Sequence, residues 1–489
     1  MKRRDFVKLA GLAAVGASPV ARLAAQMPGM TAGAAAAAQD ATKADFTLQI
    51  APVALELAPN LVISTTGYNG ASPGPILRMK EGTPVTVDVI NETDVPEFVH
   101  WHGLLVPSEV DGAEEEGTPV VSPHGRRRYQ FTPRPAGTRW YHTHAMAGLD
   151  LHRGTYTGQY GFLIVEAAQN PGNYDQEVFL ALRDWEPFFS AMAENEAAEQ
   201  DMGPGVRVVT PERPAVLDTR PNGLEVQSQL YSINDKSLGS GEPIRVRPGT
   251  RVLMHLLNAS AIENRRISLP GHQFNVLALD GNPVPTPKAV EVLVLGPGER
   301  VDAFVEMNQP GVWILGETQD MVRNAGLGVV IEYAGQSRQP RWTPPMTTAW
   351  DYTVFGRTTP GTATAPPDQT IDLVFEKIPR GDGRFNTFTV NGKQYPHERE
   401  LMLKQGARYR IVFHNRTDDS HPLHMHRHLF ELVDINGKPT SGIMKDTVIV
   451  PFFGRATVDM VADQPGLTLF HCHIQQHMDF GFKALFYYS

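Results

Sequence analysis

The residues best suited to chemistry are histidines that recur as His-x-His pairs, together with the chain's single cysteine. Ten of the 17 histidines fall in four clusters, which are His100/His102, His142/His144, His421/His424/His426 and His471/His473/His477, with Cys472 inside the last. A thiolate and several imidazoles at short spacing are the ligands that a soft, redox-active metal needs, and copper fits this set best. The repeated spacing therefore predicts a copper site rather than a chance grouping of polar residues.

The spacing of the pairs also predicts geometry. Alternate side chains of a β-strand point to the same face, so each His-x-His pair is expected to present two imidazoles to one side. In His471-Cys472-His473 the two histidines would face one way and the cysteine the other. One short strand would then carry a metal site on each face, connected through its own backbone.

Composition bounds the class of protein. A length of 489 residues indicates three units of roughly 150 residues each. The 44 glycines and 39 prolines make turns frequent, which favours many short strands over long helices. The net charge of −9 argues against a nucleic-acid partner, and no segment after the leader has the roughly 20 apolar residues of a membrane-spanning helix. We therefore expect neither nucleic-acid binding nor an integral membrane protein.

Residues 1–42 have the features of a low-complexity leader. Adjacent Arg3 and Arg4 precede a short apolar stretch, the pattern of a twin-arginine export signal. Cleavage after Ala25 and cleavage within Ala34–Ala38 are both compatible with the sequence. We expect a periplasmic or secreted protein, and a single cysteine means that export would not serve disulfide formation.

Three segments resemble one another: Gly74–Thr93, Glu242–Ser260 and Arg399–Thr417. In each, a glycine is followed nine residues later by an asparagine, with alternating apolar and polar residues between them. This alternation predicts a half-buried strand leaving a turn, repeated once in each of three domains.

The repeat also distributes the candidate ligands. Nine residues past the asparagine stand His100 in the first copy and His424 in the third, but Ile267 in the second. A second landmark, five residues after a glycine, gives His142, Gly316 and His471. The middle copy is therefore expected to have the fold without the ligands. Because Thr143 matches Cys472, only the third copy can build a thiolate site.

Domain boundaries follow from the repeats and the loop-rich segments between them. We place domain 1 at 45–168, domain 2 at 174–335 and domain 3 at 369–489. Residues 336–368, rich in Pro, Thr and Gly, are expected to form an extended linker. Helix-forming residues within Pro187–Gly205 predict a short helix at the edge of domain 2.

The histidine motifs resemble the four copper-binding signatures of the three-domain multicopper oxidases, the laccase group. They are HWHG from His100, WYHTH from Trp140, HPLHMH from His421 and HCHIQQHMDFGF from His471. The resemblance covers almost the whole chain after the leader, and together the motifs are very specific. It implies an exported bacterial enzyme with an all-β fold of three tandem cupredoxin-like Greek-key β-sandwich domains.

The resemblance also implies four copper ions and a role for each ligand. Type 1 copper would be bound by His421, Cys472 and His477, and type 2 copper by His100 and His424. The two type 3 coppers would be held by His102, His142 and His473 and by His144, His426 and His471.

Such sites imply a laccase-like oxidase that takes single electrons from a small reducing substrate and reduces dioxygen to water. Electrons would enter at the type 1 site and cross through Cys472 to His471 and His473. The family places an axial ligand ten residues after the cysteine, and Phe482 stands there. Phenylalanine cannot coordinate, so we expect a high reduction potential, while Phe482 also serves as core packing.

Oxygen reduction consumes protons, and two acids are candidates for supplying them. Asp111 matches a carboxylate that the family places near the trinuclear centre, although Asp111-Gly112 is also a turn signal. Asp479 is a second candidate. Met478 stands where some bacterial relatives carry an acid. Arg427 stands where the family commonly has glycine, and the sequence does not explain this arginine.

Other polar residues are expected to play ordinary roles. Isolated histidines are more often hydrogen-bonded or surface groups than ligands, while His428 is placed to support a ligand. The Glu114–Glu116 run predicts a solvated loop.

Alternative functions differ in the electron donor or in the need for copper. Phenols and aromatic amines are favoured over metal ions such as cuprous, ferrous or manganous. For cuprous ion soft thioether ligands would be expected, but the 16 methionines are scattered and no methionine-rich insert, as in the bacterial cuprous oxidases of the family, lies between Phe355 and Thr370. A copper-free structural protein of the same fold is disfavoured by the complete ligand set. A two-domain nitrite reductase would not need all four clusters.

Overall fold

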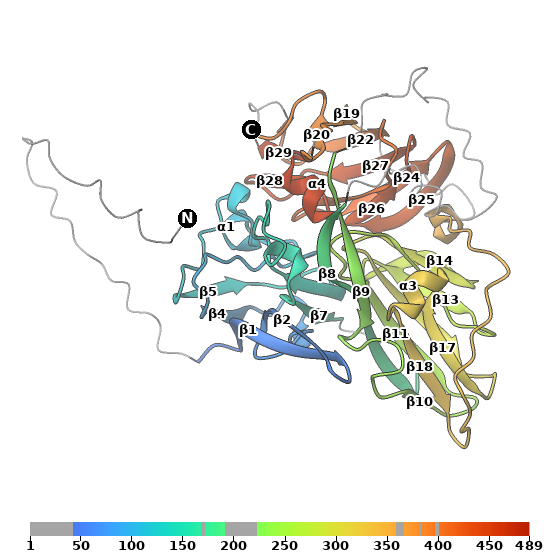
Figure 1. The fold of residues 1–489 in the computed structure, drawn as a ribbon. Helices are drawn as coiled ribbons and strands as arrows, with labels where there is room; N and C mark the ends of the chain where they lie inside the picture. The colour runs from blue at the N-terminus through green and yellow to red at the C-terminus, as the bar shows by residue number, and fades with distance from the viewer. Residues whose placement is uncertain are drawn as a thin grey trace, which may run out of the picture. The chain divides into compact units, whose positions relative to one another are not determined.

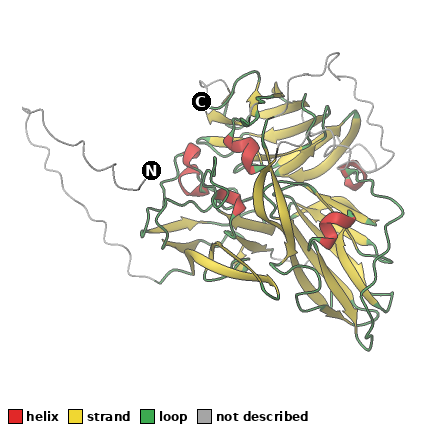
Figure 2. Cartoon of the chain, in the orientation of Figure 1, coloured by secondary structure: helices red, strands yellow, loops and turns green. Residues whose placement is uncertain are grey.

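The structure, a computed structural model, describes residues 43–167, 172–190, 223–357, 366–381, 383–396 and 401–488. The leader at 1–42 lies outside these residues. Strands dominate and the helices are single turns (Figure 2), so the predicted all-β fold is confirmed. The described helices are α1 (Ser108–Asp111), α3 (Asp320–Asn324) and α4 (Gln475–Asp479), with 3-10 turns η1 (Glu114–Glu116), η2 (Gly154–Tyr156) and η3 (Tyr352–Phe355). None of these helices is long and apolar enough to cross a membrane.

The described strands form six sheets, two in each of three successive sandwiches. The first sandwich packs sheet β2-β1-β4-β5 against sheet β3-β7-β6 around a shared core that includes Val87, Tyr129 and Leu163. Its strands are β1 (Phe46–Ala58), β2 (Leu61–Tyr68), β3 (Leu77–Lys80), β4 (Val85–Asn91), β5 (Arg126–Phe131), β6 (Gly137–His142) and β7 (Tyr160–Glu166).

The middle sandwich pairs sheet β14-β13-β16-β11-β8-β9 with sheet β10-β18-β17-β12-β15. Its strands are β8 (Gln176–Ser190), β9 (Glu225–Ile233), β10 (Ile244–Val246), β11 (Arg251–Asn258), β12 (Arg265–Ser268), β13 (Phe274–Leu279), β14 (Asn282–Val290), β15 (Val292–Leu295), β16 (Arg300–Glu306), β17 (Val312–Glu317) and β18 (Gly328–Tyr333). Pro187–Ser190, the first residues of the segment expected to contain a short helix, continue β8 and pair with β9, while its helix-forming residues, Ala191 to Glu199, are not among the described residues. Residues 191–205 lie outside the described part.

The third sandwich pairs sheet β20-β19-β22-β27-β24-β25 with sheet β21-β29-β28-β23-β26. Its strands are β19 (Gln369–Ile378), β20 (Thr387–Val390), β21 (Leu401–Leu403), β22 (Arg408–Asn415), β23 (His421–Met425), β24 (Phe430–Ile435), β25 (Lys438–Lys445), β26 (Thr447–Val450), β27 (Arg455–Val461), β28 (Thr468–Cys472) and β29 (Lys483–Tyr488). Figure 1 shows the three groups of strands in chain order, from blue through green to red. A continuous buried core joins the middle and third sandwiches.

The internal repeat corresponds to one structural unit. Strands β4, β11 and β22 each lie parallel to the first strand of their sandwich and antiparallel to the strand on the other side. The repeated asparagine ends each strand. Asn91 donates from Nδ2 to the carbonyl oxygens of Val95 and Val121, and its Oδ1 accepts from the backbone N–H of Thr93. Because Asn258 and Asn415 bond in the same way, this side chain fixes the loop that leads toward the ligand positions.

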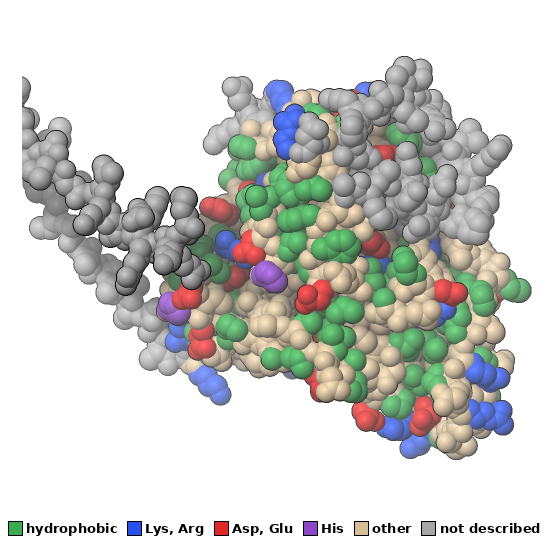
Figure 3. All heavy atoms as spheres, viewed as in Figure 1, with side chains coloured by type: hydrophobic (Ala, Val, Ile, Leu, Met, Phe, Trp, Pro, Cys, Tyr) green, Lys and Arg blue, Asp and Glu red, His purple; other side chains and the backbone are tan. Residues whose placement is uncertain are grey.

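Charged side chains are spread over the surface rather than gathered by sign. Figure 3 shows acidic and basic side chains scattered among apolar ones on the face in view. The charged side chains that contact the histidine clusters, such as Asp111 and Asp446, are buried instead.

Candidate metal centre

One candidate site joins three buried side chains from neighbouring elements of the third sandwich. Cys472 Sγ, at the end of β28, lies 3.6 Å from Nδ1 of His421 in β23 and 3.6 Å from Nδ1 of His477 in α4. The two Nδ1 atoms are 3.2 Å apart. Burial raises the pKa of the Cys472 thiol, so a metal that takes the thiolate must displace a proton on binding.

A hydrogen-bond chain orients His421 toward the sulfur. Its Nε2 lies 2.6 Å from Thr417 Oγ1, and that hydroxyl donates to Oδ1 of Asn415, the repeated asparagine. The hydroxyl can then only accept from His421, which leaves Nδ1 of His421 unprotonated and facing Cys472. The repeat therefore positions a candidate ligand directly.

Two phenylalanines form the walls of this three-residue site. The Phe482 ring centroid lies 4.7 Å from that of His421, and the Phe388 centroid lies 4.2 Å from that of His477. Phe482 is fully buried and its carbonyl accepts from the backbone N–H of Cys472 at 3.1 Å. The residue thus packs the core and offers no donor atom to a metal.

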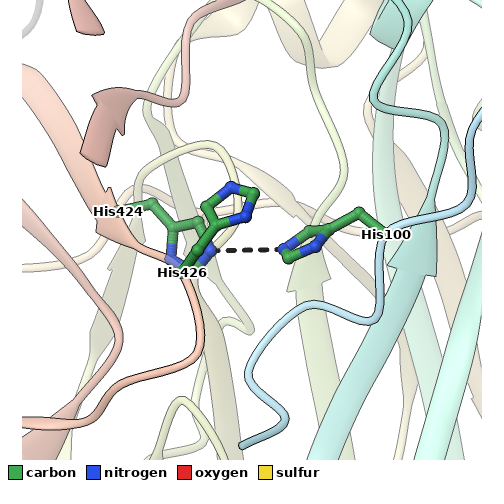
Figure 4. Close-up of side chains that lie close together, drawn as sticks. All are labelled: His100, His424 and His426. Atoms are coloured by element: carbon green, nitrogen blue, oxygen red, sulfur yellow. Dashed lines mark hydrogen bonds between the residues drawn. The ribbon is translucent and has the colours of Figure 1, made fainter. Parts of the chain in front are cut away.

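The other eight histidines form one buried cluster between the first and third sandwiches. The members are His100, His102, His142 and His144 from the first and His424, His426, His471 and His473 from the third. Figure 4 shows His100 approaching His424 and His426, with 3.4 Å between Nε2 of His100 and Nε2 of His424. The expected triple of His144, His426 and His471 lies within ligand distance, and the ring centroids of His102, His142 and His473 are 5.1–5.6 Å apart.

We expected both histidines of each His-x-His pair to lie in one strand, and this prediction is wrong. His142, His424 and His471 are in strands, but their partners lie beyond the strand ends, while His102 lies in a turn. His100 makes an isolated bridge with His142. Both members of each pair still reach the cluster, because the strands of two sandwiches end at the same place.

Ring nitrogens of the cluster point at one another in a way that fits metal ions. Four histidines, His100, His142, His424 and His471, place Nδ1 2.8–2.9 Å from a backbone carbonyl oxygen, which fixes a proton on Nδ1 and leaves Nε2 as an acceptor. Nε2 of His471 nevertheless lies 3.0 Å from Nε2 of His426. Among the described residues, Nε2 of His142 and both ring nitrogens of His473 have no hydrogen-bond partner.

The same neutral form follows from the electrostatics. Burial and neighbouring imidazoles hold the pKa of His102, His142, His144, His424 and His471 well below its usual value. Neutral imidazoles with inward lone pairs are what copper requires, so the residues fit the metal that the sequence predicts.

Cys472 connects the two sites. Its side chain belongs to the three-residue site, and the histidines on either side of it belong to the eight-histidine cluster. His471 Nδ1 also lies 2.8 Å from the carbonyl oxygen of Cys472. A single peptide segment therefore links both candidate centres.

Asp111 lies within the eight-histidine cluster. Its Oδ2 is 2.7 Å from Nδ1 of His426 and 3.0 Å from Nδ1 of His100. Burial alone would raise the pKa of Asp111, but His100 and His426 outweigh this and hold it well below its usual range. The carboxylate thus orients one imidazole of the first sandwich and one of the third.

Asp479 lies elsewhere. Its Oδ2 accepts from the backbone N–H groups of Ala147 and Gly148, and Gln475 Nε2 donates to it at 3.0 Å. Burial raises the pKa of Asp479 despite these bonds. The acid therefore ties α4, which carries His477, to the loop after His144 of the first sandwich.

Several residues of the site were missed from the sequence. The solvated loop expected at Glu114–Glu116 is wrong for Glu116, which is 3% exposed, lies 3.7 Å from Nδ1 of His426 and accepts from the backbone N–H of Leu469. Asp446 was also missed, although its Oδ1 lies 3.1 Å from Nε2 of His102. A charged pair, Lys445-Asp446, directly after the apolar residues Ile443 and Met444 was the available signal.

Arg427 adopts φ 59°, the left-handed conformation that glycine takes without steric cost. Its buried guanidinium donates to the carbonyl oxygens of Val106, Gln464, Pro465 and Leu467 and to Thr468 Oγ1. The arginine thus ties the first sandwich to the loop before β28. The conformation explains why glycine suits this position.

Several isolated histidines outside the cluster make side-chain hydrogen bonds. His255 bonds Asp302 and Glu177, His272 bonds the Tyr333 hydroxyl, and His428 Nε2 lies 2.5 Å from the Tyr488 hydroxyl. His397 lies outside the described residues.

Comparison with known proteins identifies related chains. Three family models described as "Multicopper oxidase" match residues 53–170, 206–331 and 364–489. Multicopper oxidase MmcO of Mycobacterium tuberculosis is 30% identical over 95% of this chain and 91% of its own length. A copper resistance protein A homolog of Pseudomonas syringae pv. tomato is 24% identical over 89% of this chain and 91% of its own. The crystal structure of a multi-copper oxidase from Pseudomonas thermotolerans superposes with a TM-score of 0.67 at 26% identity, covering 91% of this chain and all of that one.

Proposed function

The chain belongs to the multicopper oxidase family, and from this premise we propose that it oxidises phenols or aromatic amines one electron at a time and reduces dioxygen to water. Copper is the cofactor of the family. We propose four ions, with type 1 copper on His421, Cys472 and His477. When bound, they would supply single-electron transfer at the type 1 site and four-electron reduction of dioxygen at the cluster.

We assign the copper ions of the eight-histidine cluster as the resemblance to the family implies. His100 and His424 would hold type 2 copper, while His102, His142 and His473 and the triple of His144, His426 and His471 would hold the type 3 pair. The single observation that carries the function is the placement of Cys472, whose sulfur faces two imidazoles and whose neighbours in sequence, His471 and His473, face the cluster. This segment gives electrons a covalent route from the donor site to the oxygen site.

The donor would be recognised beside His477. Glu225, at the start of β9, places Oε2 3.8 Å from Nε2 of His477, and Asn386 donates to its other oxygen. Oxidation of a phenol releases a proton, and a carboxylate within reach of the donor hydroxyl can accept it. Glu225 therefore favours a donor that carries an O–H or N–H group.

A second candidate function is oxidation of metal ions, and the same observation supports it. A carboxylate oxygen is a hard ligand that suits ferrous or manganous ions better than cuprous ion, which prefers thioethers. The exposed methionines of the described residues, Met146, Met321, Met346 and Met402, lie on different elements and form no thioether cluster there. Organic donors remain the leading proposal.

Protons for oxygen reduction would come by way of Asp111, the carboxylate that contacts both His100 and His426. Asp479 would act farther out, where its hydrogen bond with Gln475 leads toward Ala145, next to His144. Phe482 would keep the type 1 potential high, because it gives the metal no axial donor.

We also propose that the leader at 1–42 directs export by the twin-arginine route to the periplasm or exterior, supported by Arg3-Arg4 and the apolar stretch after it. The domain boundaries that we propose, 45–168, 174–335 and 369–489 with a linker at 336–368, keep every described strand inside one domain.

Oxygen uptake by the copper-loaded mature protein tests the proposal, comparing a methoxyphenol with cuprous and ferrous ions at matched concentrations. Uptake with the phenol and little with either metal is the expected result. The reverse result would establish a metal-ion oxidase. No uptake by a protein that binds no copper would overturn the oxidase function itself.

A further inference from the structure

The middle sandwich supplies no histidine to either candidate centre, yet one of its arginines reaches the cluster. Arg300 opens β16 and is fully buried. Its Nη1 and Nη2 donate to Oδ1 and Oδ2 of Asp446 at 2.8 and 2.6 Å, a bidentate pair. Such a pair fixes both the position and the plane of the carboxylate.

Asp446 and its neighbour Thr447, in the third sandwich, contact His102 of the first sandwich and His424 of the third. Asp446 Oδ1 lies 3.1 Å from Nε2 of His102, and Thr447 Oγ1 lies 3.2 Å from the same atom. The Asp446 carbonyl oxygen lies 2.8 Å from Nδ1 of His424. His102 can therefore donate from Nε2, which leaves its buried Nδ1, without a partner among the described residues, as the metal-binding atom.

Arg300 is itself held rigidly. Nη1 donates to the carbonyl oxygen of Gly298, and Nη2 donates to that of Asp280. Nε donates to the carbonyl oxygen of Thr138 in the first sandwich at 3.3 Å. The guanidinium cannot rotate without breaking contacts to all three sandwiches.

The loop that carries Arg300 also packs against the cluster directly. Gly298 has φ +88°, and a side chain there would meet the His473 ring at 2.8 Å. Asp280 accepts from the backbone N–H groups of Asp446 and Thr447 and forms an ion pair with Lys445 at 2.9 Å. The middle sandwich thus holds residues 445–447 in place through hydrogen bonds to their backbone and an ion pair to a side chain.

We propose that Arg300 of the middle sandwich is a positioning residue for the eight-histidine centre, which it sets by holding Asp446 against His102 and His424. The inference rests on the proposed assignment of copper to this cluster. It gives the ligand-free middle sandwich a specific part in the oxygen site. The three-residue site at Cys472 makes no contact with Arg300 in the described structure.

The test is copper binding by Arg300→Met and Arg300→Lys, read by copper content and by the separate spectroscopic signals of type 1, type 2 and type 3 copper. We expect Arg300→Met to weaken copper binding at the cluster by roughly 10- to 100-fold, as outer-shell changes commonly do, and to keep the blue type 1 band. Arg300→Lys keeps the charge without the bidentate fork, so a smaller loss is expected.

A matched control is Arg323→Met. Arg323 is also a buried arginine of the middle sandwich, but its contacts are Glu317, Thr318, Asp320 and Trp342. This variant should keep all copper signals. Equal loss of type 1 and cluster copper in Arg300→Met, or unchanged cluster binding in both Arg300 variants, would overturn the inference.

The outcomes separate this inference from the proposed function. If the unmodified protein binds no copper at the cluster, the copper assignment fails. If it binds copper there and Arg300→Met binds it equally well, only the positioning role fails. If Arg300→Met does not fold, Arg300→Lys measured against Arg323→Met decides the question.

Discussion

Oδ2 of Asp111 lies 2.7 Å from Nδ1 of His426, so a carboxylate of the first sandwich holds an imidazole of the third. The same oxygen lies 3.0 Å from Nδ1 of His100. This contact brings together residues 315 positions apart in the chain. It therefore sets the geometry of the cluster across the interface between sandwiches.

Asp111→Asn should slow oxygen reduction by roughly 10- to 100-fold, because the amide keeps the shape but loses the charge and the proton-accepting carboxylate. The blue type 1 band and its reduction by donor under anaerobic conditions should be unchanged. Stopped-flow reoxidation of the reduced protein by oxygen measures the effect. Asp94→Asn, at an exposed acid that pairs with His124, is the control. Normal reoxidation in Asp111→Asn would remove the residue from the proton route.

Glu225→Gln should lower kcat/KM for a phenol by roughly tenfold, since a charge-assisted hydrogen bond to the donor is lost. Steady-state oxygen uptake over a range of phenol concentrations gives kcat and KM separately. The matched control is Glu242→Gln, a change at an exposed acid of the same sandwich. Equal kinetics in both variants would show that the donor binds away from Glu225.

Phe482→Met should lower the reduction potential of the type 1 site, because a thioether beside His421 can donate to the oxidised metal. The potential is measured by redox titration of the blue band. Phe413→Met, in the same sandwich but packed against Phe375 and Phe470, should leave it unchanged. An unchanged potential in Phe482→Met would mean that the ring does not occupy the axial position.

Arg427→Gly should destabilise the protein by roughly 3 kcal/mol. Relief of the left-handed backbone returns about 1 kcal/mol, but several buried carbonyl oxygens lose their donor at about 1 kcal/mol each. Urea unfolding of the copper-free protein measures the difference, with Arg427→Lys expected to fall between the two. A glycine variant more stable than the parent would contradict the account of this arginine.

His255 should make stability fall at alkaline pH. Burial lowers its pKa, but Asp302 and Glu177 outweigh burial and raise the pKa to about 9. The folded value exceeds the unfolded value of about 6.5, so the stabilisation is complete below pH 6.5 and is lost as pH rises toward 9. The contribution is on the order of 3 kcal/mol at most.

The measurement is urea unfolding at pH 6 and pH 9 for the parent and for His255→Asn. The difference between the two proteins should shrink at the higher pH, and the subtraction removes the pH dependence of the copper sites. A difference that is equal at both pH values would show that His255 is not charged in the folded state.

Features that depend on residues close together in the sequence could be predicted, namely the repeated strand and the grouping of the histidines. The repeated glycine and asparagine predicted one strand in each of three domains, because each asparagine closes a loop a few residues away, as Asn415 does with Thr417 and Asp419. The sandwich fold itself was implied by the resemblance of the histidine motifs to a known family. The histidine motifs predicted which residues the structure brings together, since metal-ligand spacing is a short-range signal.

Contacts across sandwiches could not be predicted in this way. Asp446 meets His102 across 344 positions, and Arg300 meets Asp446 across 146. Neither residue stands in a motif, so only the folded chain reveals the relationship. The burial of Glu116 could not be predicted, because it depends on contact with Leu469 in β28, which lies far along the sequence.

The division of the cluster between the first and third sandwiches also fixes when in synthesis it can form. His100 to His144 are made early, but His471 lies 327 positions after His144, and His473 follows it. An emerging chain carries four of the eight histidines while the middle sandwich is made, six once His426 has been added, and all eight only after His473. The eight-histidine cluster can therefore assemble only after the whole middle sandwich and most of the third have been synthesised.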